Sequence, residues 1–206
     1  MKFSSGFGRR QNVYGEFIWA GISPIGIQVI DRLENKVTIL DLNLNFVHNI
    51  SINQSLYPEM AQIDLWGKIF MYSNTYNGIF ILDNNYITNE PFIDFSKEFY
   101  SNYCIKDFAI NSSGEVGILG CDGKFNLFSQ NGLKKRSIPI EIRNPRFLIS
   151  IRDDWFVFNA GGVCLSIFNY EEISAPKMSS PILDIATINR SIAILTKEQI
   201  LVLNVR

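Results

Sequence analysis

Short apolar runs separated by polar turns recur along the whole chain. Between Lys106 and Gly132 the runs FAI, VGIL and FNLF are divided by NSSG, CDG and SQNG. Runs of this length are too short for helices, and Asn and Gly tolerate the positive φ that tight turns require. The pattern predicts an antiparallel meander, and the protein is expected to be all-β.

The meander is repeated five times. The first run of each repeat lies in EFIWAGISPIG, EMAQIDLWG, IKDFAINSSG, RFLISIRDD or ILDIATINR, and a second and third run follow each. The third runs begin at Val37, Ile79, Lys124, Val163 and Ile200, at spacings of 42, 45, 39 and 37 residues. A four-stranded propeller blade repeats about every 40 to 45 residues, so the period predicts five such blades.

A more polar fourth run follows each of the first four repeats, as expected for the outer strand of a blade: FVHNISI, YITNEPFI, LKKRSIPI and EEISAPKM. The fifth repeat has no fourth run, and residues 1–14 have the length to supply it and so remove an unpaired edge. We expect a single domain over residues 1–206 with blades at 15–53, 58–92, 104–140, 146–178 and 182–206 plus 1–14.

Two segments could be mistaken for longer helices. Pro91 to Tyr103 has apolar residues at helical spacing, and one short helix is predicted there. The stretch PEMAQIDLWGKIF contains good helix formers, but its place in the repeat predicts strand, turn, strand.

The pattern resembles the β-propeller superfamily in the broad sense that includes WD-repeat proteins. Period and turn placement carry the resemblance, with Asp107 and Asp184 in register in DFAINSSG and DIATINRS. No blade ends in Trp-Asp, and the only histidine, His48, is not preceded by Gly, so the WD signatures themselves are missing. The resemblance implies a propeller without assigning it to the WD subfamily.

Composition indicates an ordinary folded protein and argues against general nucleic-acid binding. The net charge is −1, from 19 basic and 20 acidic side chains. The basic run KKR at 134–136 is interpreted as a solvated edge strand. No signal-peptide core and no apolar run of membrane-spanning length occurs in the sequence. Cys104, Cys121 and Cys164 lie within apolar runs, which predicts buried thiols in a reducing compartment and a cytoplasmic location.

Catalytic motifs are absent. There is no HExxH, CxxC, Walker or Rossmann pattern, so no metal, nucleotide or other cofactor is expected. His48 lies in an alternating outer-strand segment and is predicted to be exposed there. Five-bladed glycoside hydrolases hold paired carboxylates near the axis, which leaves Asp64, Asp107 and Asp184 as an alternative. However, Asp107 and Asp184 share a blade position, and a repeated residue indicates a structural role, such as bonding backbone amides. We therefore expect no enzyme activity.

The loops offer a binding surface instead. Tryptophans 19, 66 and 155 are expected in the core, although Trp66 in LWG could also be an exposed anchor for a partner. In a propeller the second-to-third strand turns and the blade connections share one face, which mixes charges and aromatics as protein interfaces do. The candidate partner-binding residues are Asp31, Arg32, Glu34, Tyr57, Glu59, Trp66, Tyr76, Asp122, Glu141, Arg143, Lys177, Lys197 and Glu198.

A compact propeller without catalytic residues is expected to bind a protein partner. Its profile resembles bacterial immunity proteins of contact-dependent growth inhibition systems, which neutralise a cognate toxin such as a nuclease. That resemblance implies that acidic side chains such as Asp31, Glu34, Glu59 and Glu141 would meet a basic toxin surface. The alternatives are an assembly subunit with a constitutive protein partner and, third, the glycoside hydrolase. No membrane or nucleic-acid partner is expected.

Overall fold

The computed structural model describes residues 14–52, 55–99, 102–174, 178, 180–188 and 191–204. The backbone forms two compact units, residues 1–102 and 103–206, and each is described by itself. The closing strand expected within residues 1–14 lies outside the described residues except for Tyr14, as does the candidate binding residue Lys177.

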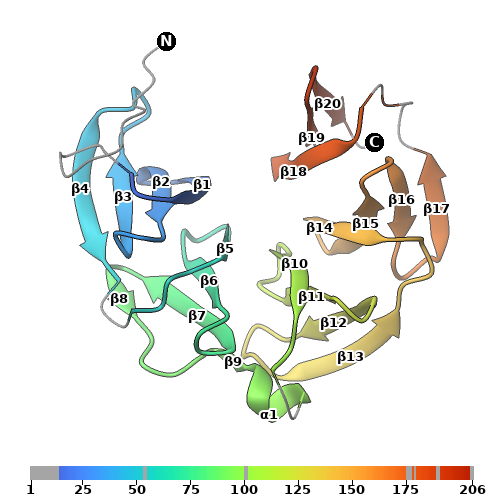
Figure 1. Ribbon diagram of the computed structural model, residues 1–206, viewed down its shortest axis with the longest axis horizontal. Helices are drawn as coiled ribbons and strands as arrows, with labels where there is room; N and C mark the ends of the chain where they lie inside the picture. The colour runs from blue at the N-terminus through green and yellow to red at the C-terminus, as the bar shows by residue number, and fades with distance from the viewer. Residues whose placement is uncertain are drawn as a thin grey trace. The chain divides into compact units, whose positions relative to one another are not determined.

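The first unit begins with a four-stranded antiparallel sheet in sequential order (Figure 1). Its strands are β1 (Phe17–Ser23), β2 (Gly26–Asp31), β3 (Lys36–Leu40) and β4 (Phe46–Ser51). β2 and β3 are largely buried, whereas β4 is mostly exposed. His48 lies on β4 and is exposed, as predicted.

The second sheet of this unit is built on β5 (Met60–Ile63), β6 (Ile69–Ser73) and β7 (Gly78–Asp83). These confirm the predicted strand, turn, strand, and the helix α1 (Phe95–Phe99) confirms the predicted short helix. The fourth run, expected as one strand, is instead two short pieces, β8 (Tyr86–Ile87) and β9 (Ile93–Asp94), which both pair with β7. Pro91 lies between the two pieces and has no N–H to donate to a ladder.

Apolar side chains from both sheets form the core of the first unit. Ile30, Val37, Met71 and Phe80 are among its buried residues, and Trp19 packs against them. Burial of these side chains between successive sheets is the main force that holds one blade against the next.

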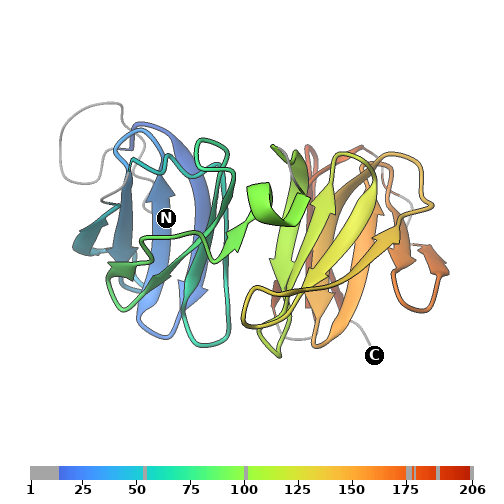
Figure 2. The same cartoon turned by 90° about the horizontal axis from the view of Figure 1, so that it is seen from below.

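The second unit contains three more antiparallel sheets, each in sequential order. Figure 2 shows their strands running between two sets of turns. The third sheet contains β10 (Ile105–Ile110), β11 (Val116–Gly120), β12 (Lys124–Phe128) and β13 (Lys134–Pro139). The fourth contains β14 (Pro145–Ile151), β15 (Asp154–Asn159), β16 (Val163–Ser166) and β17 (Glu171–Ser174), and the fifth β18 (Ile182–Ile188), β19 (Ser191–Thr196) and β20 (Ile200–Asn204).

The repeated meander defines an all-β fold, a five-bladed β-propeller, as the sequence predicts. Trp155 is 1% exposed and contacts Phe125 at a ring-centroid distance of 5.3 Å, which confirms its predicted core position. The run at 134–136 lies on β13 with all three side chains exposed, which confirms the predicted edge strand. Among the described residues, no helix is long and apolar enough to cross a membrane.

The expectation that the cysteines are unpaired thiols is wrong for two of them. Cys104 and Cys121 form a disulfide with a Cα–Cα distance of 5.4 Å, and only Cys164 is a buried free thiol. The reason is register. Ile105 pairs with Gly120 in the β10–β11 ladder, so the next residues outward, the two cysteines, face one another. The cysteines therefore do not indicate a reducing compartment.

Candidate functional site

Loops of the first unit bring together five of the predicted partner-binding residues. The β2–β3 turn is tied to the segment before β5 because the Arg32 guanidinium lies 3.4 Å from Glu16 Oε1 and 3.7 Å from Glu59 Oε1. Glu34 is exposed in the same turn. We call the polar loop surface the group formed by Arg32, Glu34, Tyr57, Glu59 and Tyr76.

The two tyrosines of the polar loop surface are held by hydrogen bonds between their loops. The Ser73 hydroxyl donates to the carbonyl of Leu56 and accepts from the amide of Tyr76 at 3.4 Å. The amide of Tyr57 donates to the Asn35 side chain at 3.2 Å, which joins the same segment to the β2–β3 turn. Three loops that are distant in sequence are therefore fixed side by side.

Both tyrosines are presented to solvent on an ordered backbone. Tyr57 is 43% exposed and Tyr76 is 45% exposed, and the Tyr76 ring packs edge-on against Phe80 at 5.8 Å. Tyr57 has a φ of 44°, a left-handed conformation that is costly for a side chain of its size. Such strain is often kept where a side chain has a function.

Asp31 does not belong to this exposed group. Its side chain is fully buried and accepts hydrogen bonds from the amides of Gly15 at 2.7 Å, Glu16 at 3.1 Å and Glu34 at 3.1 Å. The sequence places Asp31 at the end of an apolar run, but it does not reveal that three backbone amides converge on it. Asp31 therefore shapes the loop and is not a contact residue.

Sequence reasoning missed two apolar residues at the same end of the first sheet. Phe17 pairs with Asp31 in the β1–β2 ladder and is 56% exposed, and Leu33 at the tip of the β2–β3 turn is 63% exposed. A leucine inside the polar turn RLENK is a signal that could have identified Leu33. Together with the tyrosines, these side chains give the polar loop surface apolar contact area.

The candidates of the second unit lie on its own turns and connections. Asp122 is engaged internally: its carboxylate accepts from the Tyr103 hydroxyl at 2.9 Å and lies 3.5 Å from Lys124 Nζ. Burial and the hydrogen bond to Asp122 raise the pKa of Tyr103 above its ordinary value. The remaining candidates are exposed, namely Glu141 and Arg143 between β13 and β14, and Lys197 and Glu198 between β19 and β20.

Trp66 is at the opposite end of the first unit's strands from the polar loop surface. It lies in the β5–β6 turn and is 64% exposed, whereas Tyr76 lies in the next turn along the chain, between β6 and β7. Consecutive turns of an antiparallel sheet lie at opposite ends of its strands. The structure therefore separates Trp66 from the polar loop surface.

The carboxylates considered for glycoside hydrolysis have structural contacts. Asp64 lies in the β5–β6 turn after the inner strand, where it accepts from the amides of Trp66 and Lys68 at 2.9 and 2.8 Å. Asp107 accepts from the amides of Phe108 and Leu148, both at 2.8 Å, and so ties β10 to β14 of the next blade. Asp184 accepts from the amide of Ile185 at 2.9 Å.

Asp107 and Asp184 do occupy equivalent positions, as the repeat predicts. Each is the first residue after a register shift in the innermost strand of its blade. Burial is the main cause that raises the pKa of Asp107 to about 7, and the charge of Asp184 contributes to the same direction. Within the described ranges, no three His, Cys, Asp or Glu side chains are grouped so that they could hold a metal ion.

Comparison with known proteins supports the fold. No family model matches the sequence, and no curated protein matches it either. One similar structure is virginiamycin B lyase from Staphylococcus aureus, in a catalytically inactive histidine-to-alanine variant with quinupristin. It matches with a TM-score of 0.58 and 14% identity, over 92% of this chain and 70% of that one.

Two other similar structures are described with protein or peptide partners. BBS1N in complex with ARL6DN matches with a TM-score of 0.61 and 10% identity, over 90% of this chain and 61% of that one. YCF48 bound to D1 peptide matches with a TM-score of 0.66 and 11% identity, over 90% of this chain and 62% of that one. At such identities the likeness establishes the class, a β-propeller, and the class includes both enzymes and binding proteins.

Proposed function

We propose that this protein is a non-catalytic β-propeller that binds a protein partner through the polar loop surface. The observation that carries the proposal is the pair of exposed tyrosines, Tyr57 and Tyr76, held beside the Arg32–Glu59 ion pair on hydrogen-bonded loops. Tyr and Arg are the residues that most often dominate binding energy at protein interfaces. Because the loops are already ordered, binding costs little conformational entropy.

The more specific role that we propose is neutralisation of a toxin, as in an immunity protein. Glu34 and Glu59 on the polar loop surface would meet basic side chains of a nuclease or similar toxin. Complementary charges of this kind mainly raise the association rate and exclude wrong partners. Salt should therefore slow association more than it speeds dissociation.

An assembly subunit with a constitutive partner is the second candidate. It is favoured by the similar folds of BBS1N and YCF48, which are described in complex with ARL6DN and with D1 peptide. The two roles differ in their partner's behaviour, because a toxin harms cells that lack the propeller and an assembly partner does not.

A lyase activity has weaker support. The lyase of similar fold is described as inactive when one histidine becomes alanine. Here the single histidine of the chain, His48, is exposed on the outer strand β4 and pairs with Ile39 across the ladder. An outer strand is remote from the inner strands on which propeller enzymes hold their acids, so His48 is poorly placed for that chemistry.

The test is to express the full chain with the product of the adjacent gene. We expect a stoichiometric complex by isothermal titration calorimetry, and we expect cells that express the neighbour alone to lose viability that coexpression restores. A stable complex with a harmless neighbour would favour the assembly role. Absence of a complex with either neighbouring product would remove the support for both.

A further inference from the structure

Several large apolar side chains are exposed at one end of the first unit's strands, the end at which Trp66 lies. They come from the end of β1 and from three turns, β1–β2, β3–β4 and β5–β6. Exposed apolar groups that cluster in this way mark binding sites in soluble proteins. We call the apolar turn surface the group formed by Ile22 at 65% exposure, Ile25 at 64%, Leu42 at 74%, Leu44 at 47%, Leu65 at 68% and Trp66 at 64%.

The three turns are neighbours in space. A Cβ placed on Gly67, next to Trp66, would lie 3.6 Å from Pro24 Cδ and 3.9 Å from Ser23 Cβ in the β1–β2 turn. In the first sheet, Ile27 at the start of β2 pairs with Leu40 at the end of β3, which places the β3–β4 turn beside the β1–β2 turn. The side chains therefore belong to one surface.

Each turn is held by its own polar side chain. The Asp64 carboxylate fixes the Trp66 amide, and the Ser23 hydroxyl accepts from the Ile25 amide at 3.2 Å. Asp41 accepts from the amides of Asn43 and Asn45 at 2.9 and 2.8 Å. The apolar residues are thus displayed on ordered turns, which lowers the entropic cost of binding.

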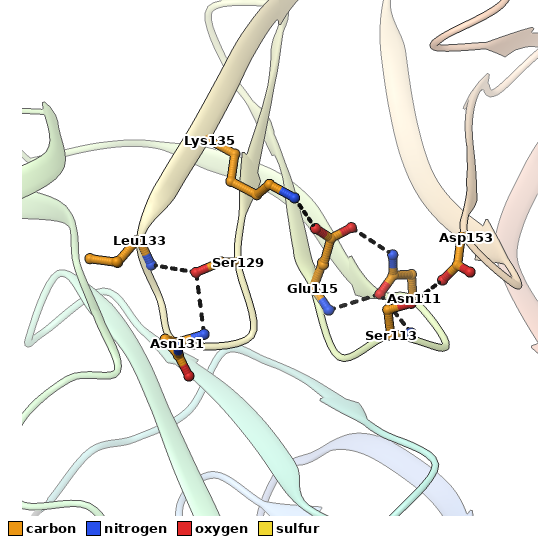
Figure 3. A network of polar contacts seen from close by, with 8 residues as sticks. All are labelled: Asn111, Ser113, Glu115, Ser129, Asn131, Leu133, Lys135 and Asp153. Carbon is orange, nitrogen blue, oxygen red and sulfur yellow. Dashed lines mark hydrogen bonds and ion pairs between the residues drawn. The ribbon is translucent and has the colours of Figure 1, made fainter.

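The β10–β11 turn of the second unit, by contrast, is polar. Between β10 and β11, the hydroxyls of Ser112 and Ser113 donate to Asp153 at 2.8 and 2.7 Å, and Figure 3 shows Ser113 pointing toward Asp153. In the same view Lys135 pairs with Glu115, and Ser129 accepts from the amides of Asn131 and Leu133. Other turns of the second unit do expose apolar side chains, Leu133 at 67% before β13 and Tyr170 at 60% before β17, so such exposure is not confined to the first unit.

The charges around the apolar turn surface are mainly acidic. Its turns carry Asp41 and Asp64, and the one lysine among them, Lys68 in the β5–β6 turn, is paired with Asp83 at the end of β7 at 3.1 Å. A second copy of this chain in a symmetric contact, or an anionic membrane, would bring like charges together. A partner with positive charges beside its apolar groups is complementary.

We propose that the apolar turn surface binds a segment of a partner protein that presents apolar side chains flanked by lysine or arginine. This site is separate from the polar loop surface and does not depend on the proposed function. Trp66, the largest exposed apolar side chain of the three turns, is the expected anchor, since a buried Trp commonly dominates binding energy at an interface.

The test uses two fluorescein-labelled amphipathic peptides with identical leucine spacing, one with lysine and one with glutamate at every polar position. Fluorescence anisotropy with the full chain should show binding of the lysine peptide and at least tenfold weaker binding of the glutamate peptide. Trp66→Ala and Leu65→Ser should each weaken binding of the lysine peptide at least tenfold. Tyr170→Ala, which removes an aromatic side chain 60% exposed in the second unit, is the control and should leave it unchanged.

Three results would overturn the proposal. One is equal binding of the two peptides, and another is binding of the lysine peptide that neither Trp66→Ala nor Leu65→Ser weakens. The third is concentration-dependent dimerisation, or binding to vesicles containing phosphatidylglycerol, that Trp66→Ala abolishes, because either would assign the surface to a different occupant. Circular dichroism of each variant separates loss of binding from loss of fold.

Discussion

At the scale of single residues, Asp107 shows how a carboxylate can serve the fold of a propeller. Its two oxygens accept one amide from its own strand and one from Leu148 in the next blade. Removing it leaves the Leu148 amide without this partner. We expect Asp107→Ala to lower the free energy of unfolding by about 1 to 3 kcal/mol, measured by urea denaturation at pH 5.

Asp184→Ala is the matched control, because Asp184 has the equivalent blade position but is exposed, and among the described residues its carboxylate accepts from the amide of its neighbour Ile185 alone. We expect this substitution to change the free energy of unfolding by less than about 0.5 kcal/mol. If both substitutions cost the same, the inter-blade bond of Asp107 is not what stabilises the second unit.

The raised pKa of Asp107 predicts a pH dependence of stability. Since the pKa in the folded protein is about 7, above the ordinary value of 3.8, the folded state keeps a proton between these limits that the unfolded state releases. Stability is therefore expected to fall as pH rises from about 4 to 7, by at most ~1.4 kcal/mol per pH unit. Urea denaturation of the wild type and of Asp107→Ala across this range should show the slope in the wild type only; a slope shared by both would assign it to other groups.

At the scale of elements, the disulfide between the segment before β10 and the segment after β11 closes a loop of 17 residues. Cross-linking a loop of this size is worth about 3 kcal/mol in the chain-entropy model. We expect the double substitution Cys104→Ser and Cys121→Ser to lower the free energy of unfolding by about 2 to 3 kcal/mol. A reductant should lower the free energy of unfolding of the wild type by the same amount and leave that of the double variant unchanged, which would confirm the disulfide. If the reductant changes the stability of neither protein, the disulfide is contradicted.

Because the third and fourth blades pack closely around Gly117, we expect a larger residue at this position to destabilise the fold. A Cβ on this residue of β11 would collide with the rings of Trp155 and Phe125, which contact each other. Gly117→Ala should lower the free energy of unfolding by about 1 to 3 kcal/mol, because two large buried rings have to move. Differential scanning calorimetry measures the change in melting temperature. Gly161→Ala is the control, since the nearest atom to its new Cβ is Asn159 Oδ1 at 3.3 Å. Equal melting temperatures for the two variants would contradict the expected clash at Gly117.

Much of this arrangement of elements could be predicted from the sequence, because period-2 apolar runs and Gly/Asn turns are local signals. The five meanders, the outer strand at 134–136 and the helix α1 follow from such signals. The pairing of Cys104 with Cys121, the burial of Asp31 and the division of the fourth run at Pro91 depend on strand register and on converging backbone amides. Short stretches of sequence do not reveal strand register or which backbone amides converge on a side chain. The position of Trp66 at the opposite end of the first unit's strands from the polar loop surface follows from the order of the turns, so the repeat alone could have predicted it.

At the scale of the whole molecule, the fold provides loops and turns for binding, and the first unit carries two surfaces of different character. The polar loop surface combines tyrosines with an ion-pair network, and the apolar turn surface combines Ile, Leu and Trp with aspartates. A protein with two such surfaces at opposite strand ends could hold two partners. Each surface can be altered without touching the core, so the two can be tested independently.

The central claim is that the polar loop surface binds the partner, and alanine substitution in the complex tests it most directly. Calorimetric titration of the adjacent gene's product should show that Tyr57→Ala combined with Tyr76→Ala raises Kd at least tenfold, as expected for central aromatic contacts. Tyr86→Ala, which removes a tyrosine 62% exposed at the opposite end of the strands, should leave Kd unchanged. Wild-type affinity in the double variant, or a larger loss with Tyr86→Ala, would contradict the account.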